Sequence, residues 1–351
     1  MKAYVLHNIG DIRYEEYEKP IPKSDEIILK VKASGICGSD IPRIYITGAH
    51  RHPIIPGHEF AGIITEIGAQ VDPSLLGKRA GVFPLLPCKT CTQCLAEHYE
   101  MCSDYGYLGS RNNGGFAEFV AVPAWNLIPL PDQVNFEEAA MIEPMAVAVH
   151  AMRKIAPKRD DFVTVCGLGT IGLLLIMFLK DTGINNILAI GNKDFQKEKA
   201  LQLGISQQNF CDIREVDANT WIMDHTHGKG TDIFMECVGK NDTFINALNS
   251  TAAAGKIMLV GNPLSDMILS RNDYWQILRK QLTVLGTWNS SYTRKADDDW
   301  HYVLHRLEQG TIHPSDLISH RLSFDHLENG LQIMHEKSED YVKVMGVLQN
   351  D

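Results

Sequence analysis

The stretch Val163–Gly172 reads VTVCGLGTIG, a β-branched run that leads into a G-x-G-x-x-G pattern. The glycine pattern alone is weak evidence, but here a strand precedes it, an apolar helix follows it, and a second strand, NNILAI (Asn185–Ile190), comes soon after. Such glycines permit a tight turn and close approach of the backbone to a pyrophosphate at a helix N-terminus. The predicted cofactor-binding residues of this turn are Gly167, Leu168, Gly169, Thr170, Ile171 and Gly172.

Further strands are predicted at Thr231–Gly239, Gly255–Asn262 and Leu282–Trp288. Strands that alternate with helices are typical of a mostly parallel, doubly wound α/β sheet. The uncharged run Phe162–Leu179 has the length of a membrane span, but its glycines divide it into a strand and a helix. We therefore interpret it as a buried strand–turn–helix.

The end of the second strand departs from the usual dinucleotide fingerprint. An acid normally stands about twenty residues after the glycines and binds the adenosine ribose, but this chain has Gly191, Asn192 and Lys193 there. The missing carboxylate removes repulsion against a 2′-phosphate, and Lys193 adds a cation. These three residues favour NADP over NAD, unless Lys193 is only a solvated loop residue and the selectivity is relaxed.

Four cysteines lie close together in PCKTCTQCLAEHYEMC. Their spacing, C-x2-C-x2-C-x7-C, lets one loop surround a tetrahedral ion and leaves no position for a substrate. An iron–sulfur cluster and a nucleic-acid zinc ribbon are the alternatives. We predict a structural zinc site at Cys88, Cys91, Cys94 and Cys102.

A second group of residues has mixed ligand types. GICGSDIPRIY supplies Cys37, PGHEFAG supplies His58 and Glu59, and IEPMAVAVHA supplies Glu143. A mixed shell with a place left for water or substrate is the pattern of catalytic zinc. These four residues are the predicted ligands of a catalytic metal.

Two neighbouring polar residues support that site. We predict that Asp40 accepts a hydrogen bond from His58 and so orients its ring towards the metal. Ser39 is placed to pass a proton from a bound alcohol towards solvent. Ser39, Glu59 and Glu143 are therefore the candidate catalytic residues.

The net charge and the cysteine content limit the classes to which this protein can belong. The chain of 351 residues has a formal net charge of −10, which argues against nucleic acid or an anionic membrane as the main partner. The first residues, MKAYVLHNIGDIRYEE, lack the apolar core of a signal peptide. In such a chain, eight cysteines indicate metal binding more strongly than disulfide bonds. We predict a cytoplasmic location.

The cysteine loop, the mixed site and the glycine pattern, in this order, resemble the zinc-dependent medium-chain alcohol and polyol dehydrogenases. The resemblance implies a GroES-like, mostly-β catalytic domain at 1–148 and 287–351, with a Rossmann domain inserted at 149–286. It also implies an NAD(P)-linked alcohol dehydrogenase of the EC 1.1.1 class, one catalytic and one structural zinc per subunit, and a homodimer or homotetramer.

Within that family, Glu143 stands where alcohol dehydrogenases place a cysteine ligand, and the Glu-Pro pair is similar to the sorbitol dehydrogenase branch. There Glu59 or a water completes the zinc shell. The stretches CGSDIPRIY, GAHRHP, PLLPC and GSRNNGGFAEF resemble the dehydrogenases of galactitol 1-phosphate and of pentitol phosphates. Gly191 departs from the NAD preference that the galactitol-phosphate enzymes imply.

The predicted reaction is oxidation of a sugar-alcohol phosphate to its keto-sugar phosphate. Arg43 and Arg111 are candidate phosphate ligands because an arginine fork suits a phosphate dianion; His50 and His52 are secondary candidates, and pairing of both arginines with surface acids is the alternative. A free-polyol or threonine dehydrogenase is a second hypothesis within the family. A zinc-ribbon nucleic-acid-binding protein and a nonenzymatic dinucleotide sensor are hypotheses from other classes.

Overall fold

The computed structural model describes residues 1–263 and 265–348. The chain divides into two compact units. The first contains residues 1–146 and the described residues from Ser290 onward, and the second contains Val147–Asn289. Each unit is described by itself below.

The first unit is mostly β. Its main sheet, within the described residues, has the order β16-β17-β3-β4-β5-β9, with β8 paired to β3, and is antiparallel except for the parallel pair β16 and β17. The strands of the whole first unit are β1 (Lys2–Asn8), β2 (Asp11–Glu16), β3 (Glu26–Ile36), β4 (Glu59–Ile67), β5 (Arg79–Val82), β6 (Leu85–Leu86), β7 (Gly106–Tyr107), β8 (Phe119–Pro123), β9 (Leu127–Pro129), β16 (Ile318–Ser323) and β17 (Lys343–Val347).

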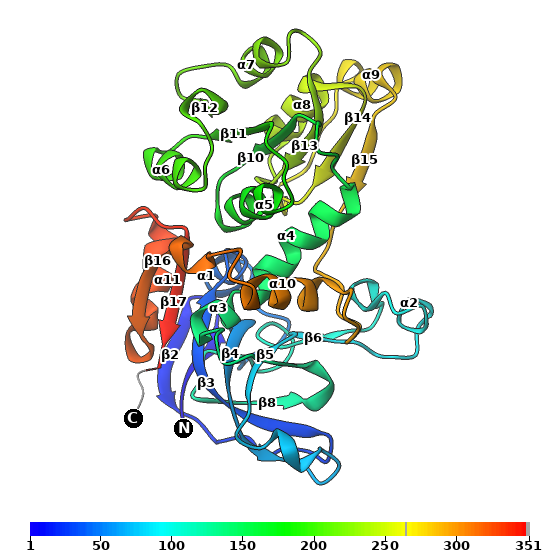
Figure 1. The fold of residues 1–351 in the computed structure, drawn as a ribbon. Helices are drawn as coiled ribbons and strands as arrows, with labels where there is room; N and C mark the ends of the chain where they lie inside the picture. The colour runs from blue at the N-terminus through cyan, green and yellow to red at the C-terminus, as the bar shows by residue number, and fades with distance from the viewer. Residues whose placement is uncertain (264, 349–351) are drawn as a thin grey trace. The chain divides into compact units, whose positions relative to one another are not determined.

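Short helices and loops connect these strands (Figure 1). The central strand β3 is apolar and almost entirely buried, as expected for a strand paired on both sides. The helices of this unit are α1 (Asp40–Tyr45), α2 (Thr92–Leu95), α3 (Phe136–Ala140), α10 (Asp299–Glu308) and α11 (Leu327–Glu336), and α4 (Ile142–Ile155) begins in this unit and ends in the second.

The second unit contains a parallel sheet of order β12-β11-β10-β13-β14-β15 among the described residues. This order is that of two mononucleotide-binding halves joined at β10 and β13. Its strands are β10 (Val163–Cys166), β11 (Ile187–Gly191), β12 (Phe210–Asp212), β13 (Thr231–Glu236), β14 (Thr251–Leu259) and β15 (Thr283–Gly286).

The helices of the second unit fall into two groups. Helix α5 contacts α6, while α8 contacts both α7 and α9, which is the arrangement of a sheet covered on two faces (Figure 1). They are α5 (Thr170–Asp181), α6 (Asp194–Gln202), α7 (Ala218–His225), α8 (Asn241–Ser250) and α9 (Arg271–Lys280). The predicted doubly wound α/β fold is thereby confirmed.

Two details differ from the sequence-based expectation. The predicted strands all form, but β14 begins earlier than expected, and the short strand β12 had not been recognised. The run Phe162–Leu179 forms β10, a turn and the buried helix α5. Within the described part of the chain, no helix combines the length and the apolar character that crossing a membrane requires.

Candidate metal centres and dinucleotide turn

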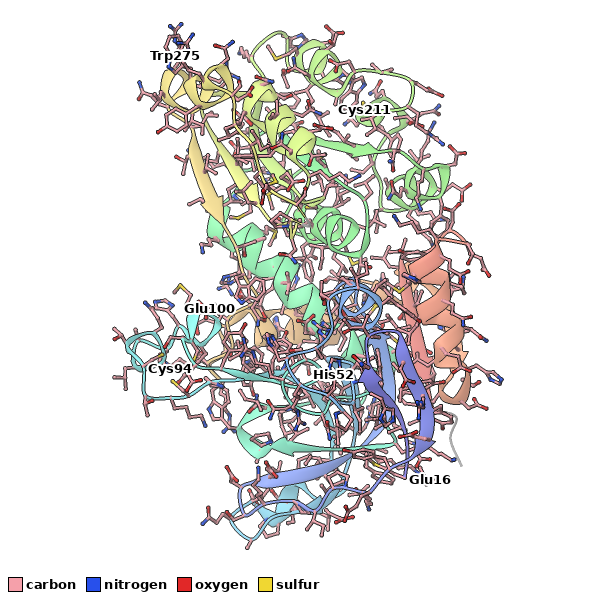
Figure 2. All side chains as sticks on the ribbon, turned by 180° about the vertical axis from the view of Figure 1, so that it is seen from behind. Glu16, His52, Cys94, Glu100, Cys211 and Trp275 are labelled. Carbon is pink, nitrogen blue, oxygen red and sulfur yellow. The ribbon has the colours of Figure 1, made fainter. Side chains whose placement is uncertain are left out.

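The four cysteines of the loop lie around one point. Their sulfur atoms are all within 4.8 Å of one another, with 3.9 Å between Cys88 and Cys94 and 4.0 Å between Cys91 and Cys102. These separations exclude disulfide bonds and suit four thiolates around one ion. Figure 2 shows Cys94 on this loop together with Glu100.

Backbone amides prepare one of these sulfurs for a metal. The N–H of Cys94 donates to the sulfur of Cys91, and such bonds lower the pKa of Cys91 to about 5. Burial instead raises the pKa of Cys94 to about 12. Because a bound cation would stabilise every thiolate, the donor set fits a closed zinc site.

The second cluster of potential ligands joins two strands of the main sheet. Cys37 directly follows β3, Glu59 begins β4, and His58 precedes it. One potential ligand atom from each of these three residues lies within 4.8 Å of the other two. Because β3 and β4 are adjacent and antiparallel, the end of one strand and the start of the other meet here. The sulfur, nitrogen and oxygen donors fit a zinc ion with an open position.

Asp40, at the start of α1, ties this cluster together. Its carboxylate accepts from the backbone N–H of Cys37 at 3.0 Å, contacts Arg43, and lies 3.4 Å from Nδ1 of His58. Burial would lower the pKa of His58, but Asp40 and Cys37 raise it well above its usual value. With Nδ1 facing Asp40, Nε2 of His58 is the nitrogen available to a metal.

Ser39 lies beside the same cluster and is exposed. Its hydroxyl donates to the sulfur of Cys37 at 3.3 Å. The side chain therefore connects the ligand cluster with solvent, as its proposed proton-transfer role requires.

Glu143 lies near this cluster but is not one of its three members among the described residues. Its Oε1 accepts a hydrogen bond from the hydroxyl of Tyr107 at 3.2 Å. Burial raises the pKa of Glu143 to about 7. Its role as a ligand stays a prediction, and Tyr107 is a partner that the sequence analysis missed, although it lies next to the quoted GSRNNGG stretch.

Two arginines, Arg43 and Arg111, lie within electrostatic range of His50. Burial lowers the pKa of His50, and the nearby charges of Arg111 and Arg43 lower it further. The guanidinium of Arg111 lies 4.5 Å from the centre of the Tyr105 ring, and that ring contacts Tyr107 edge-on. Both arginines therefore act on His50, and Arg43 is at the same time paired with Asp40. The ring of His52 lies against the backbone of the Gly48–Ala49 turn and accepts from the N–H of Ala49 at 3.4 Å.

The glycine turn of the second unit has the shape that a pyrophosphate needs. Gly167 has a positive φ of 95°, and a Cβ at Gly172 would collide with the backbone carbonyl of Gly167. By contrast, a Cβ at Gly169 would have no neighbour within 4 Å. Gly169 caps the twelve-residue helix α5, so open space lies at a helix N-terminus. Leu168, Thr170 and Ile171 complete the turn.

Gly191 ends β11 and Lys193 caps the start of α6. Asn192, exposed, donates its backbone N–H to the side chain of Gln196 at 3.3 Å. Arg214 is a further cation nearby, because the residue before it bonds to the carbonyl of Gly191. It pairs with Asp194 and Asp212 and was missed because β12 was not predicted.

Two family models match the chain. One is the alcohol dehydrogenase GroES-like domain, at residues 23–132, and the other is the zinc-binding dehydrogenase model, at residues 170–309. A galactitol 1-phosphate 5-dehydrogenase of Escherichia coli K12 is 34% identical over 93% of this chain and 94% of its own length. The chain belongs to the zinc-binding alcohol dehydrogenase family. It is therefore an oxidoreductase of the NAD(P)-linked alcohol dehydrogenase class, with the predicted GroES-like and Rossmann folds.

Relatives with other substrates are similarly close. A (R,R)-butanediol dehydrogenase of Bacillus subtilis is 32% identical over 98% of this chain and 99% of its own length. A sorbitol dehydrogenase of the same species is 28% identical over 98% and 96%. These relatives support an alcohol or polyol dehydrogenase and leave the substrate open.

Solved structures agree with the fold. A crystal structure of galactitol-1-phosphate dehydrogenase from E. coli has a TM-score of 0.92 and 33% identity, covering 99% of this chain and 100% of that one. A Sinorhizobium meliloti protein bound to NADP has a TM-score of 0.89 and 25% identity, with coverage of 99% and 98%. An E. coli CFT073 protein complexed with NADH has a TM-score of 0.90 and 26% identity, covering 99% of both chains. Relatives of this fold therefore hold either dinucleotide.

Proposed function

We propose that this enzyme interconverts a sugar-alcohol phosphate, such as galactitol 1-phosphate or a pentitol phosphate, and the corresponding keto-sugar phosphate. The observation that supports the proposal is that the charges of Arg43 and Arg111 both act on His50, near the mixed ligand cluster. Arg43 already pairs with the buried Asp40, so Arg111 is the main candidate for a phosphate. Burial and the charge of Glu143 raise the pKa of Tyr107 well above its usual value, and the charge of Arg43 partly opposes this shift. A phosphate dianion suits these arginines better than a neutral polyol does.

We further propose a catalytic zinc ion held by Cys37, His58 and a glutamate, and a structural one held by the cysteine loop. A catalytic ion would supply Lewis acidity at the alcohol oxygen, and the dinucleotide would accept the hydride. The protein residues position the reaction. Asp40 keeps His58 in the orientation that presents Nε2, and Ser39 carries the alcohol proton from the cluster towards solvent.

For the cofactor we propose a preference for NADP over NAD. The absence of an acid at Gly191 and the position of Lys193 at the N-terminus of α6 support it. Arg214 adds a second cation, although Asp194 and Asp212 already neutralise it in part. The preference therefore depends mainly on Lys193.

We also propose a homodimer or homotetramer. The strand order ends at β15, and no further strand pairs with it in the described part of the second unit. Helix α9, which contacts β14, exposes Tyr274, Trp275 and Leu278; Figure 2 shows Trp275 on this helix. An open sheet edge beside exposed apolar side chains suits a second copy of the chain. The cytoplasmic location stays a prediction.

The deciding experiment is steady-state oxidation of galactitol 1-phosphate, xylitol 5-phosphate, arabitol phosphate and free sorbitol, each with NAD and with NADP. We expect kcat/KM for a phosphorylated substrate to exceed that for free sorbitol by about a hundredfold, which corresponds to about 2.7 kcal/mol. If free sorbitol is the better substrate, the phosphate proposal is wrong and the family assignment remains.

A further inference from the structure

Lys343 and Glu59 form an ion pair in the interior of the first unit. Lys343 is 2% exposed and Glu59 is 1% exposed. The lysine Nζ donates to Oε2 of Glu59 and also to the backbone carbonyl of Ile36 at 3.1 Å. A buried charge without a partner is costly, so each of these side chains depends on the other.

The sheet explains how the two side chains meet. Strand β3 lies between β17, which carries Lys343, and β4, which begins with Glu59. Gly35 of β3 stands opposite Glu59 in the ladder. A Cβ at Gly35 would overlap Oε2 of Glu59, so the glycine leaves the space in which the lysine and the carboxylate meet.

The same glutamate belongs to the cluster with Cys37 and His58. Its carboxylate therefore faces two cations, Lys343 and any metal held by that cluster. Lys343 reaches this carboxylate at Oε2, so the lysine lies directly beside the ligand cluster.

We propose that Lys343 is a positioning residue that competes with the catalytic metal for Glu59. By holding Oε2, the lysine keeps Glu59 from becoming a permanent fourth ligand and leaves a position for the substrate alcohol. This inference rests on the proposed metal site but not on the identity of the substrate.

The test measures zinc release from the intact protein to a chromophoric chelator, without alcohol or dinucleotide. A Cys37→Ala variant identifies the release phase that belongs to this site. In Lys343→Met, we expect that phase to slow at least about tenfold, because Glu59 is free to bind the metal. Lys256→Met is the matched control, since Lys256 lies in the second unit and donates to the backbone carbonyl of Ile155. This variant should release zinc at the wild-type rate.

A double-mutant cycle tests whether the effect acts through Glu59. In a Glu59→Gln background, Lys343→Met should change the release rate less than threefold. A merely structural role for Lys343 predicts release that is unchanged or faster, and this result would overturn the proposal. Equal slowing in both backgrounds would also overturn it, because simple charge repulsion would then suffice.

Stability provides a second measurement. Lys343→Met leaves a buried carboxylate unpaired, so the zinc-stripped protein should melt at a lower temperature, while added zinc should raise the melting temperature more than in the wild type. A lower melting temperature without the larger zinc response would contradict the proposal. If Lys343→Met does not fold, Lys343→Gln, which still donates to Ile36, carries the same expectations.

Discussion

The hydroxyl of Tyr107 lies 3.2 Å from Oε1 of Glu143. Glu143 is buried and Tyr107 is half-buried. The hydrogen bond opposes the effect of burial, because it stabilises the ionised carboxylate. Tyr107 also contacts the ring of His58 edge-on, with 5.8 Å between ring centres. One phenol thus links the carboxylate to the predicted metal ligands.

This contact predicts a pH effect. Burial raises the pKa of Glu143 to about 7, and the bond from Tyr107 lowers it from a still higher value. The prediction concerns the zinc-free protein, because a bound cation would itself favour the ionised carboxylate. In Tyr107→Phe, the pKa of Glu143 in the zinc-free protein, followed by NMR, should rise by about one unit. Tyr105→Phe should not move it, and a fall in this pKa would refute the prediction.

Replacing Arg111 tests the proposed binding site for the substrate phosphate. In Arg111→Ala, kcat/KM for the phosphorylated substrate should fall about 10- to 100-fold, since one charge-assisted contact is lost. Turnover of free sorbitol should change little. Arg13→Ala removes a surface arginine paired with Asp11 and serves as the control. Equal losses with both substrates would mean that Arg111 supports the fold and not the phosphate.

Lys193 provides a test of cofactor preference. In Lys193→Ala, the KM for NADP should rise about tenfold, which corresponds to about 1.4 kcal/mol, while the KM for NAD stays nearly constant. Lys197→Ala, one turn further along α6, should affect neither. An unchanged ratio of the two KM values would show that Lys193 does not contact a 2′-phosphate.

The cysteine loop should contribute to stability and not to chemistry. In Cys94→Ser, elemental analysis should find one zinc per chain where the wild type has two. The melting temperature should fall by roughly 5–10 °C, because each 1 kcal/mol corresponds to roughly 2–4 °C in a domain of this size. Cys166→Ala, in a buried strand of the second unit, should retain both metals. Two retained metals in Cys94→Ser would contradict the four-thiolate site.

The exposed face of α9 should hold the oligomer together. Leu278 is 56% exposed and Trp275 is 42% exposed, so glutamate at both positions should leave the monomer folded and disfavour burial against a second copy. Light scattering should then find a smaller assembly than in the wild type. Leu76→Glu, at an exposed site in the first unit, is the control. An unchanged mass would place the interface elsewhere.

The features that the sequence determined are local. The glycine turn after Val163–Cys166 and the spacing of the cysteine loop each involve residues close together in the chain, so short-range geometry suffices to predict them. The mixed ligand types grouped Cys37 with His58, Glu59 and Glu143, and the structure gathers the first three of these residues.

Other features depend on which strands become neighbours. Nothing near Lys343 in the sequence indicates that it crosses Gly35 to reach Glu59, since that contact requires β3 to lie between β17 and β4. The bond from Tyr107 to Glu143 likewise joins residues 36 positions apart. Residue types and their spacing along the chain therefore predict which residues could bind a metal and a dinucleotide. Which buried charges compete for those residues depends on the fold, because an ion pair requires distances that strand order and register set.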